Sequence, residues 1–175
     1  MLLSDFQRRL LLCVLALSLA ACGFTLRGAR ELPAGMAVTY VQAGAPGSPL
    51  AAYLKSFLRE SSVRAVDYAT PDAAVLKVRD STRRRVLSVD AHAKAREFEV
   101  QYSATFSLSM PGAESEFPEK TITLSRDYVF DRQAVLAANE EESMLLQEMQ
   151  RELARMIVEQ IAAYPWRSAP ADTLK

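Results

Sequence analysis

Cysteine and histidine are almost absent from this sequence of 175 residues, which contains two cysteines and one histidine. A zinc site needs several such ligands, and the densest carboxylate group, Glu140–Glu142, points around a helix start rather than converging. No serine or cysteine stands in a nucleophile motif, and no glycine-rich loop is present to hold a phosphate. The sequence therefore predicts neither an enzyme nor a metal or cofactor site.

The single histidine, His92, lies in the short segment Asp90–Ala93, which has the composition of a turn. Asp90 and His92 could in principle act as a base and its orienting carboxylate. No activated nucleophile accompanies them, since Ser88 is an ordinary strand residue. We therefore favour a solvated turn histidine.

An excess of charge of one sign is also missing, because 21 basic residues balance 21 acidic residues. The overall charge therefore identifies no partner, and only local clusters can do so. The densest positive cluster is the run Arg83-Arg84-Arg85.

The first 21 residues are organised as a secretory leader, with two arginines, an apolar run over 10–19 and small residues before Cys22. The leader is too short to remain in a bilayer as a spanning helix. Cleavage as an ordinary signal peptide would leave Cys22 as a free thiol. The run Leu-Ala-Ala-Cys instead resembles the lipobox of bacterial lipoproteins, in which this sulfur is acylated. We predict a lipoprotein signal peptide over 1–21 and lipidation at Cys22.

Gly23 follows the lipidation site, and the resemblance to lipoprotein sorting rules implies export to the outer membrane. Cys13 is lost with the leader and Cys22 is consumed by the lipid, so no disulfide is expected. The remaining residues are enough for one domain over 22–165, followed by a flexible tail over 166–175.

The first third of the mature chain predicts a strand and a helix. Val38–Val41 is rich in β-branched and aromatic residues. Ser48 and Pro49 are suited to the N-cap and the first position of a helix over about 49–61, whose apolar residues recur at i, i+3 and i+4. Residues 63–66 can add a brief edge strand.

The middle of the chain predicts a β-meander. From Phe98 to Met110 the even positions are apolar and the odd positions polar, so one face is expected in the core and the other in water. Pro111-Gly112 turns the chain into a partner strand over about 121–130. Arg126 falls on its apolar register, where it either extends its guanidinium to water near the sheet end, forms a buried ion pair, or contacts a partner.

The strand before this meander, over about 74–89, cannot keep one face buried throughout. Leu76 and Val78 have even numbers, whereas Leu87 and Val89 have odd ones. We predict a bulge or break near 81–85, at the arginine run.

The last helix is predicted to begin at Asn139 as N-cap, with Glu142 three residues later in a capping-box arrangement, and to end before Pro165. Met144, Met149 and Met156 indicate either an adaptable binding surface or core residues, and we favour core. The predicted buried stripe comprises Leu145, Met149, Leu153, Met156, Ile157, Ile161 and Tyr164.

The order strand, helix, three strands, helix predicts an α+β fold. Its two helices are expected on one face of a mostly antiparallel, roughly four-stranded sheet. The other face is rich in hydroxyl groups, which suits water and also suits a partner.

The arginine run has two interpretations, and both remain open. Arg83 and Arg85 share one face with Lys77 and Arg79, while Arg84 lies on the other face, and such charges protect a sheet edge from aggregation. Alternatively the cluster binds an anion, because arginine binds phosphate in bidentate fashion. The residues of this candidate lipopolysaccharide or anion site are Arg83, Arg84, Arg85, Lys94 and Arg96.

The compartment and the composition narrow the choice of anion. On an outer-membrane lipoprotein the available phosphates are those of lipid A. Binding of single-stranded nucleic acid needs aromatic residues interleaved with the cations, and these are missing. No nucleic-acid partner is expected.

Taken in order, these segments resemble the LptE family of lipopolysaccharide (LPS)-assembly lipoproteins. The resemblance is carried by residues 19–28, the turn Pro111-Gly112, the run 125–128 and the helix start and stripe over 139–161. It covers essentially all of residues 19–165.

The resemblance implies an α+β domain that lies mostly inside the lumen of the large β-barrel LptD, where the pair inserts LPS into the outer leaflet. It also implies LPS binding by basic residues near the turn between the second and third strands and near the start of the last helix. Those two places hold Ala91 and His92, and Ala137 to Asn139, so positive charge has to come from the candidate cations above. The expected function is a non-catalytic plug and assembly chaperone. The alternative is a stand-alone, lipid-anchored module in the periplasm that binds LPS or another anion.

Overall fold

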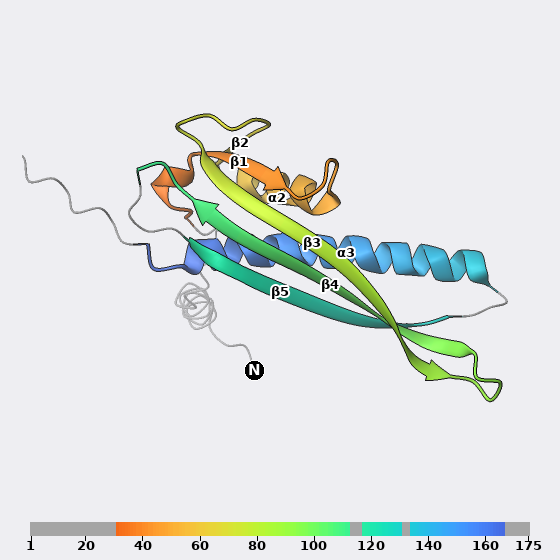
Figure 1. The fold of residues 1–175 in the computed structure, drawn as a ribbon. Coiled ribbons are helices and arrows are strands. Elements are labelled where there is room, and N and C mark those ends of the chain that lie inside the picture. The colour runs from red at the N-terminus through yellow and green to blue at the C-terminus, as the bar shows by residue number, and fades with distance from the viewer. Residues whose placement is uncertain (1–30, 113–116, 131–133, 167–175) are drawn as a thin grey trace, which may run out of the picture.

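The computed structural model describes residues 31–112, 117–130 and 134–166, apart from the side chain of Ala137. Figure 1 shows a long two-layer domain in which three extended strands run alongside one long helix. The predictions made for the leader, for Cys22 and for residues 167–175 lie outside the described residues.

The described elements follow a short 3-10 turn at Ala34–Met36. They are β1 (Val38–Ala43), α2 (Pro49–Glu60), β2 (Arg64–Val66), β3 (Ala74–Val89), β4 (Ala95–Ser109), β5 (Phe117–Val129) and α3 (Val135–Ala163). The strands form one sheet in the order β2-β1-β3-β4-β5. Helix α2 packs on β1 and β2, α3 packs on β4 and β5, and the helices contact each other in one layer. The predicted α+β class with two helices on one face is confirmed.

The sheet has five strands rather than about four, because the brief edge strand expected over 63–66 does form. Its residues Arg64–Val66 pair in parallel with β1, and β1 also pairs in parallel with β3. Strands β3, β4 and β5 pair antiparallel. Because α2 returns the chain to the same end of the sheet, the parallel pairing of β1 and β2 follows from their strand-helix-strand order.

Helix α2 begins as the sequence predicts. The Ser48 hydroxyl accepts a hydrogen bond from the Ala51 N–H at 3.4 Å, and Pro49 occupies the first helical position. Leu50, Leu54 and Leu58 are fully buried against the sheet. Burial of three leucines, at about 1.5–3 kcal/mol each, fixes α2 on the sheet far more firmly than its cap does.

The alternation predicted for β4 is confirmed. Its five even residues from Val100 to Leu108 are buried in the core, while the odd residues lie on the face away from the helices. That outer face carries two rungs of paired hydroxyl groups between β4 and β5. Ser103 pairs with Thr123 at 2.9 Å, and Thr105 pairs with Thr121 at 2.8 Å.

The predicted bulge in β3 is misplaced by a few residues. The register with β4 is continuous from Val75 to Val86, and it shifts only between Val86 and Ser88 and again before Val89. The residues at 81–85 need no bulge because both their faces are exposed, so no buried register has to be kept there. The hydrophobic pattern sets the register only where a layer covers the strand.

The predicted start of α3 is wrong. The helix begins at Val135 with Ala134 at its N-cap, which makes no side-chain capping bond. Asn139 lies in the second turn and is exposed. Glu142 does not close a capping box, because its carboxylate is held by Tyr128 and Arg84 from the sheet.

The buried stripe of α3 is confirmed, since Met149, Leu153, Ile157 and Ile161 are buried at the sheet interface. The core interpretation of the methionines holds for Met149 but is wrong for Met144, which is 63% exposed. No helix among the described residues is both long and apolar enough to cross a membrane.

The structure places Arg126, whose interpretation was open, and Trp166, the first residue of the predicted tail. Arg126 is an exposed residue of β5 that forms an ion pair with Glu152 of α3 at 2.8 Å, so the pair is not buried. Trp166, which the sequence assigns to the tail, packs against Tyr164 and Phe117, and its indole N–H donates to the Ile161 carbonyl at 2.9 Å.

Candidate functional site

The predicted cations all lie on one long hairpin. Strand β1 pairs with β3 only as far as Val78, so the far half of β3 has a neighbour on one side only. We call residues 80–104, the far half of β3 with the paired part of β4, the distal hairpin. Figure 1 shows its tip extending past the N-terminal end of α3. Strand β3 contains 16 residues, which span roughly 50 Å at about 3.3 Å per residue.

The tip of the distal hairpin is a defined turn. The Asp90 carboxylate accepts hydrogen bonds from the N–H groups of His92 at 2.8 Å and Lys94 at 3.0 Å. Ala93 adopts a positive φ of 58°, a strained value for a residue with a side chain. His92 and Lys94 are exposed, in agreement with the predicted turn histidine.

The arginines of the run separate onto two faces, as their numbering predicts. Arg85 lies on the outer face, where its Nε is 2.6 Å from the Glu99 carboxylate on β4. The hydrogen bond to Glu99 and its negative charge raise the pKa of Arg85. Arg83 shares this face and has no ion-pair partner among the described residues. Arg83 is therefore more available to bind an anion than Arg85.

Arg84 points to the helix side and is tied into the structure. Its guanidinium lies 3.1 Å from Glu142 and 4.9 Å from the centroid of the Phe98 ring. The Tyr128 hydroxyl donates to the same carboxylate at 2.5 Å, and the Tyr128 ring stacks on Phe98. Hydrogen bonding to Tyr128 and the charge of Glu142 raise the pKa of Arg84. Burial, together with the bond to Glu142, raises the pKa of Tyr128. Arg84 thus fastens the hairpin to α3 and has little capacity left for an external anion.

The structure therefore divides the five predicted site residues. Arg83, Lys94 and Arg96 are exposed and have no ion pair within the described part of the chain. Arg84 and Arg85 are already neutralised. The predicted row of four cations on β3 is also interrupted, because Arg79 pairs with Glu119 at 3.0 Å.

Exposed apolar side chains accompany the free cations, and sequence reasoning missed them. Val86, Leu87, Val89 and Val129 are between 43% and 57% exposed at the same end of the sheet. The switch of parity in Val86-Leu87-Ser88-Val89 was the available signal, because it excludes a common buried face. Cations beside exposed apolar groups suit an amphipathic anion such as a lipid with a phosphorylated head group.

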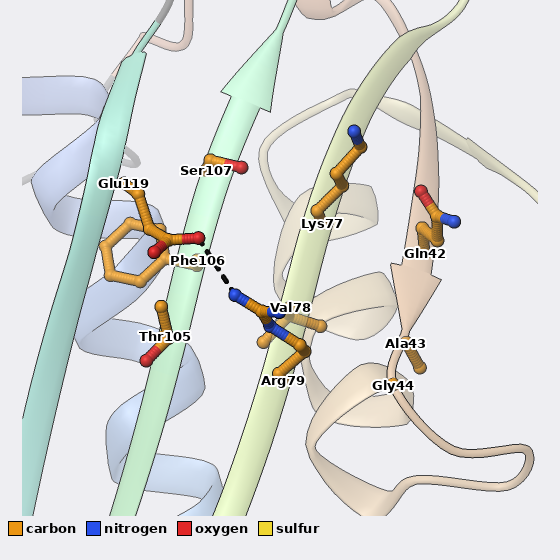
Figure 2. A pocket seen from close by; sticks show the side chains of 10 residues that line it. All are labelled: Gln42, Ala43, Gly44, Lys77, Val78, Arg79, Thr105, Phe106, Ser107 and Glu119. Carbon is orange, nitrogen blue, oxygen red and sulfur yellow. Dashed lines mark hydrogen bonds and ion pairs between the residues drawn. The ribbon is translucent and has the colours of Figure 1, made fainter.

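A second feature, also missed, is a shallow hollow of about 540 Å³ at the corner where β1 leaves the sheet. Figure 2 shows Arg79 and Glu119 joined across it, with Lys77 and Gln42 on the other side. A Cβ on Gly44 would lie 3.2 Å from the Arg79 Cγ, so glycine leaves room for that side chain. The hollow is polar and open to solvent.

A third polar group joins the sheet to both helices. The Tyr102 hydroxyl donates to the Asp80 carboxylate at 2.7 Å, and the Ser48 hydroxyl at the start of α2 donates to the same carboxylate at 3.4 Å. Burial of Tyr102 and its bond to Asp80 raise the pKa of the phenol, and Gln150 of α3 also bonds to it. This cluster positions the layers. No group of three His, Cys, Asp or Glu residues close enough to hold a metal ion occurs in the described ranges.

These features define a two-layer α+β protein with two extended surfaces, namely a polar outer sheet face and a basic hairpin with exposed apolar side chains near its turn. The chain belongs to the LptE family, because the family model described as LptE, Lipopolysaccharide-assembly, matches residues 36–161. The resemblance seen in the sequence is thereby confirmed.

Individual relatives agree with this assignment. The LPS-assembly lipoprotein LptE of Pectobacterium atrosepticum is 31% identical over 160 residues, covering 89% of this chain and 86% of the relative. The protein of the same name from Photorhabdus laumondii is 30% identical over 153 residues, covering 87% and 83%.

Solved structures share the fold. Rare lipoprotein B of Shewanella oneidensis superposes with a TM-score of 0.62 at 27% identity, covering 71% of this chain and 93% of that one. Lipoprotein B of Nitrosomonas europaea gives a TM-score of 0.65 at 28% identity, covering 81% and 91%.

Proposed function

We propose that this protein is an outer-membrane lipoprotein, anchored through Cys22, that binds inside an LptD-like β-barrel and assists its assembly and the insertion of LPS. Its relatives are named LPS-assembly lipoproteins. An acylated Cys22 would hold the domain at the inner face of the outer membrane through several acyl chains, each contributing about 0.8 kcal/mol per buried CH₂.

The observation that carries the proposal is the hydrophilic character of both broad surfaces. The outer sheet face satisfies its own hydroxyl groups in cross-strand pairs. The free face of α3 carries exposed charges, including the Arg155–Glu159 ion pair. The interior of a large outer-membrane barrel is polar. A well-packed domain with two polar surfaces is suited to fill such a lumen without adhering to lipid.

Co-purification tests the barrel partnership. We expect the full chain, extracted from the outer membrane in mild detergent, to bring down one large β-barrel at about a one-to-one ratio. Recovery of the protein alone, with LPS still bound, would support the stand-alone module instead. A Cys22→Ser variant should lose its acyl label, and retention of the label would contradict the anchor.

The distal hairpin is the proposed contact for LPS. Arg83, Lys94 and Arg96 offer free cations, and the exposed Val86 and Val89 near the turn offer apolar surface for acyl chains. Edge protection remains the competing explanation for these cations. The two explanations differ in whether removing the charges changes LPS affinity.

Substitution of the three free cations by serine separates these explanations. We expect affinity for purified LPS to fall about tenfold or more, which is a loss of about 1.4 kcal/mol in binding free energy. Arg151→Ser, which removes an exposed cation from α3, is the matched control and should leave affinity unchanged. Arg84 is left in place because its loss would loosen the hairpin. Equal affinity of the triple variant and the parent would assign the cations to edge protection.

A further inference from the structure

The far half of β3 has an open edge. The last backbone bond between β1 and β3 runs from the Gly44 N–H to the Val78 carbonyl at 2.9 Å. Backbone groups alternate in direction along a strand, so the even residues after Val78 also point toward the side that β1 has left. The outward-pointing residues are Asp80, Thr82, Arg84 and Val86.

The N–H and C=O groups of these four residues have no hydrogen-bond partner among the described residues. An unpaired row of this kind is a template for another strand. It begins where Gly44 turns away and ends at the bulge after Val86. Its seven residues cover about 23 Å, which is the length of an ordinary strand.

The other edges of the sheet are less available. Strand β2 presents only three residues. On β5 the odd residues point outward, but the Arg126 side chain donates to the outward Ser125 carbonyl at 3.1 Å and to Glu152 at 2.8 Å. Arg126 thus occupies the middle of that edge. No side chain in the described part of the molecule covers the β3 edge in the same way.

Charge disfavours a second copy of this chain as the occupant. The symmetric antiparallel register that uses all of residues 80–86 is centred on Arg83, so it sets two Arg83 side chains opposite each other. Like charges directly opposite are destabilising. An incoming strand with a carboxylate at that position would instead neutralise Arg83, which has no ion pair of its own among the described residues.

We propose that the open edge of β3, residues 80–86, adds an extended acidic segment of the partner barrel protein as a sixth strand, on the side of β3 opposite β4. Strand addition gives affinity through main-chain bonds and specificity through alternate side chains. The inference rests on the proposed barrel partnership, and it identifies a contact that the partnership alone does not.

Hydrogen exchange on the purified complex tests the inference. We expect the amides of Thr82, Arg84 and Val86 to exchange rapidly in the free protein and at least tenfold more slowly in the one-to-one complex. A complex that forms while these amides still exchange rapidly would overturn the inference and leave the barrel partnership intact. Failure to form any complex would refute both. Slow exchange already in the free protein would mean that this chain covers its own edge, which also refutes the inference.

Proline substitution provides a second test. Thr82→Pro removes one outward N–H, and we expect the yield of complex to fall at least tenfold, while Thr82→Val, which keeps the N–H, binds normally. Asp127→Pro removes an outward N–H from β5 outside the cross-strand hydroxyl pairs, and it should not affect the complex. Equal loss in both proline variants would contradict the assignment to β3. If Thr82→Pro alters the thermal unfolding of the free protein, the exchange measurement decides.

Discussion

The two halves of β3 belong to one strand but have opposite environments. Residues 74–78 lie between β1 and β4, and their even side chains are buried beneath the helices. Residues 80–89 have β4 on one side only, and their side chains are mostly exposed. Strand-forming sequence alone does not produce this difference, because both halves belong to one strand that pairs with β4. The end of β1 at Ala43 produces it.

The comparison separates the buried part of the strand from the exposed part. The near half contributes core leucine and valine, whereas the far half presents cations, apolar tips and open backbone groups. Substitutions in the two halves should therefore affect different measurements.

The largest difference is expected between Leu76→Ala and Val86→Ala. Leu76 is fully buried, so its truncation should lower the free energy of unfolding by about 2–5 kcal/mol. Val86 lies half exposed at the hairpin end, and its truncation should cost less than about 1 kcal/mol. Urea unfolding of both variants measures the difference. Equal losses would show that the far half is packed in solution.

The junction of the two halves is tested by Tyr102→Phe. This variant removes the hydroxyl that donates to Asp80 and leaves a part-buried carboxylate oxygen without that donor. We expect a loss of about 1–3 kcal/mol in unfolding free energy. Tyr68→Phe, at an exposed tyrosine, is the matched control and should be neutral. A neutral Tyr102→Phe would show that water satisfies Asp80 equally well.

The same tyrosine predicts a loss of stability at alkaline pH. Because the pKa of Tyr102 is raised by burial and by Asp80, the unfolded chain ionises at about pH 10 while the folded protein keeps the phenol protonated. Stability from this group is complete below about pH 10 and is lost as pH rises further, by about 1.4 kcal/mol per unit. Urea unfolding at several alkaline pH values should show that the free energy of unfolding falls less steeply with pH in Tyr102→Phe than in the parent protein. Parallel slopes would assign the effect to other groups.

Attachment of the far half to α3 is tested by Arg84→Ala. The ion pair with Glu142 and the contact with Phe98 are partly exposed, so we expect a loss of about 0.5–1 kcal/mol. Hydrogen exchange should also accelerate in the first turns of α3. Unchanged exchange there would mean that the sheet holds the helix start without Arg84.

The smallest effect is expected for Arg83→Ala. Its guanidinium contacts no acid among the described residues, so unfolding free energy should change by less than about 0.5 kcal/mol. Comparing the thermal unfolding of this variant with that of Arg84→Ala shows whether adjacent arginines have separate roles. A large destabilisation would place Arg83 in the packing of the hairpin.

Periodicity predicted the parts of the fold in which one layer covers another. The alternation of β4 and the stripe of α3 are confirmed because each meets a continuous apolar partner. The helix start at Asn139 was wrong because Glu142 is held by Tyr128 and Arg84, which lie far away in the sequence. A local capping pattern contains no information about such tertiary partners.

The candidate site was predictable in residue type but not in availability. The numbering of Arg83 and Arg84 correctly placed them on opposite faces. Which arginines of the run are free depends on Glu99, which pairs with Arg85, and on Glu142, which pairs with Arg84. These pairings require the strand register and the position of α3. The open edge was beyond prediction from sequence, because it depends on where β1 ends relative to β3.

The parallel pairing of β1 with β3 has a consequence for the order of folding. Thr39 pairs with Ala74 across an intervening helix and strand, whereas β3, β4 and β5 form successive hairpins. Loop closure over a longer segment costs more entropy and slows pairing. Because a chain is made from its N-terminus, β1 exists before its partner does. We expect β3, β4 and β5 to pair first and β1 to dock last. The apolar side chains of β1 therefore need protection from aggregation until it docks.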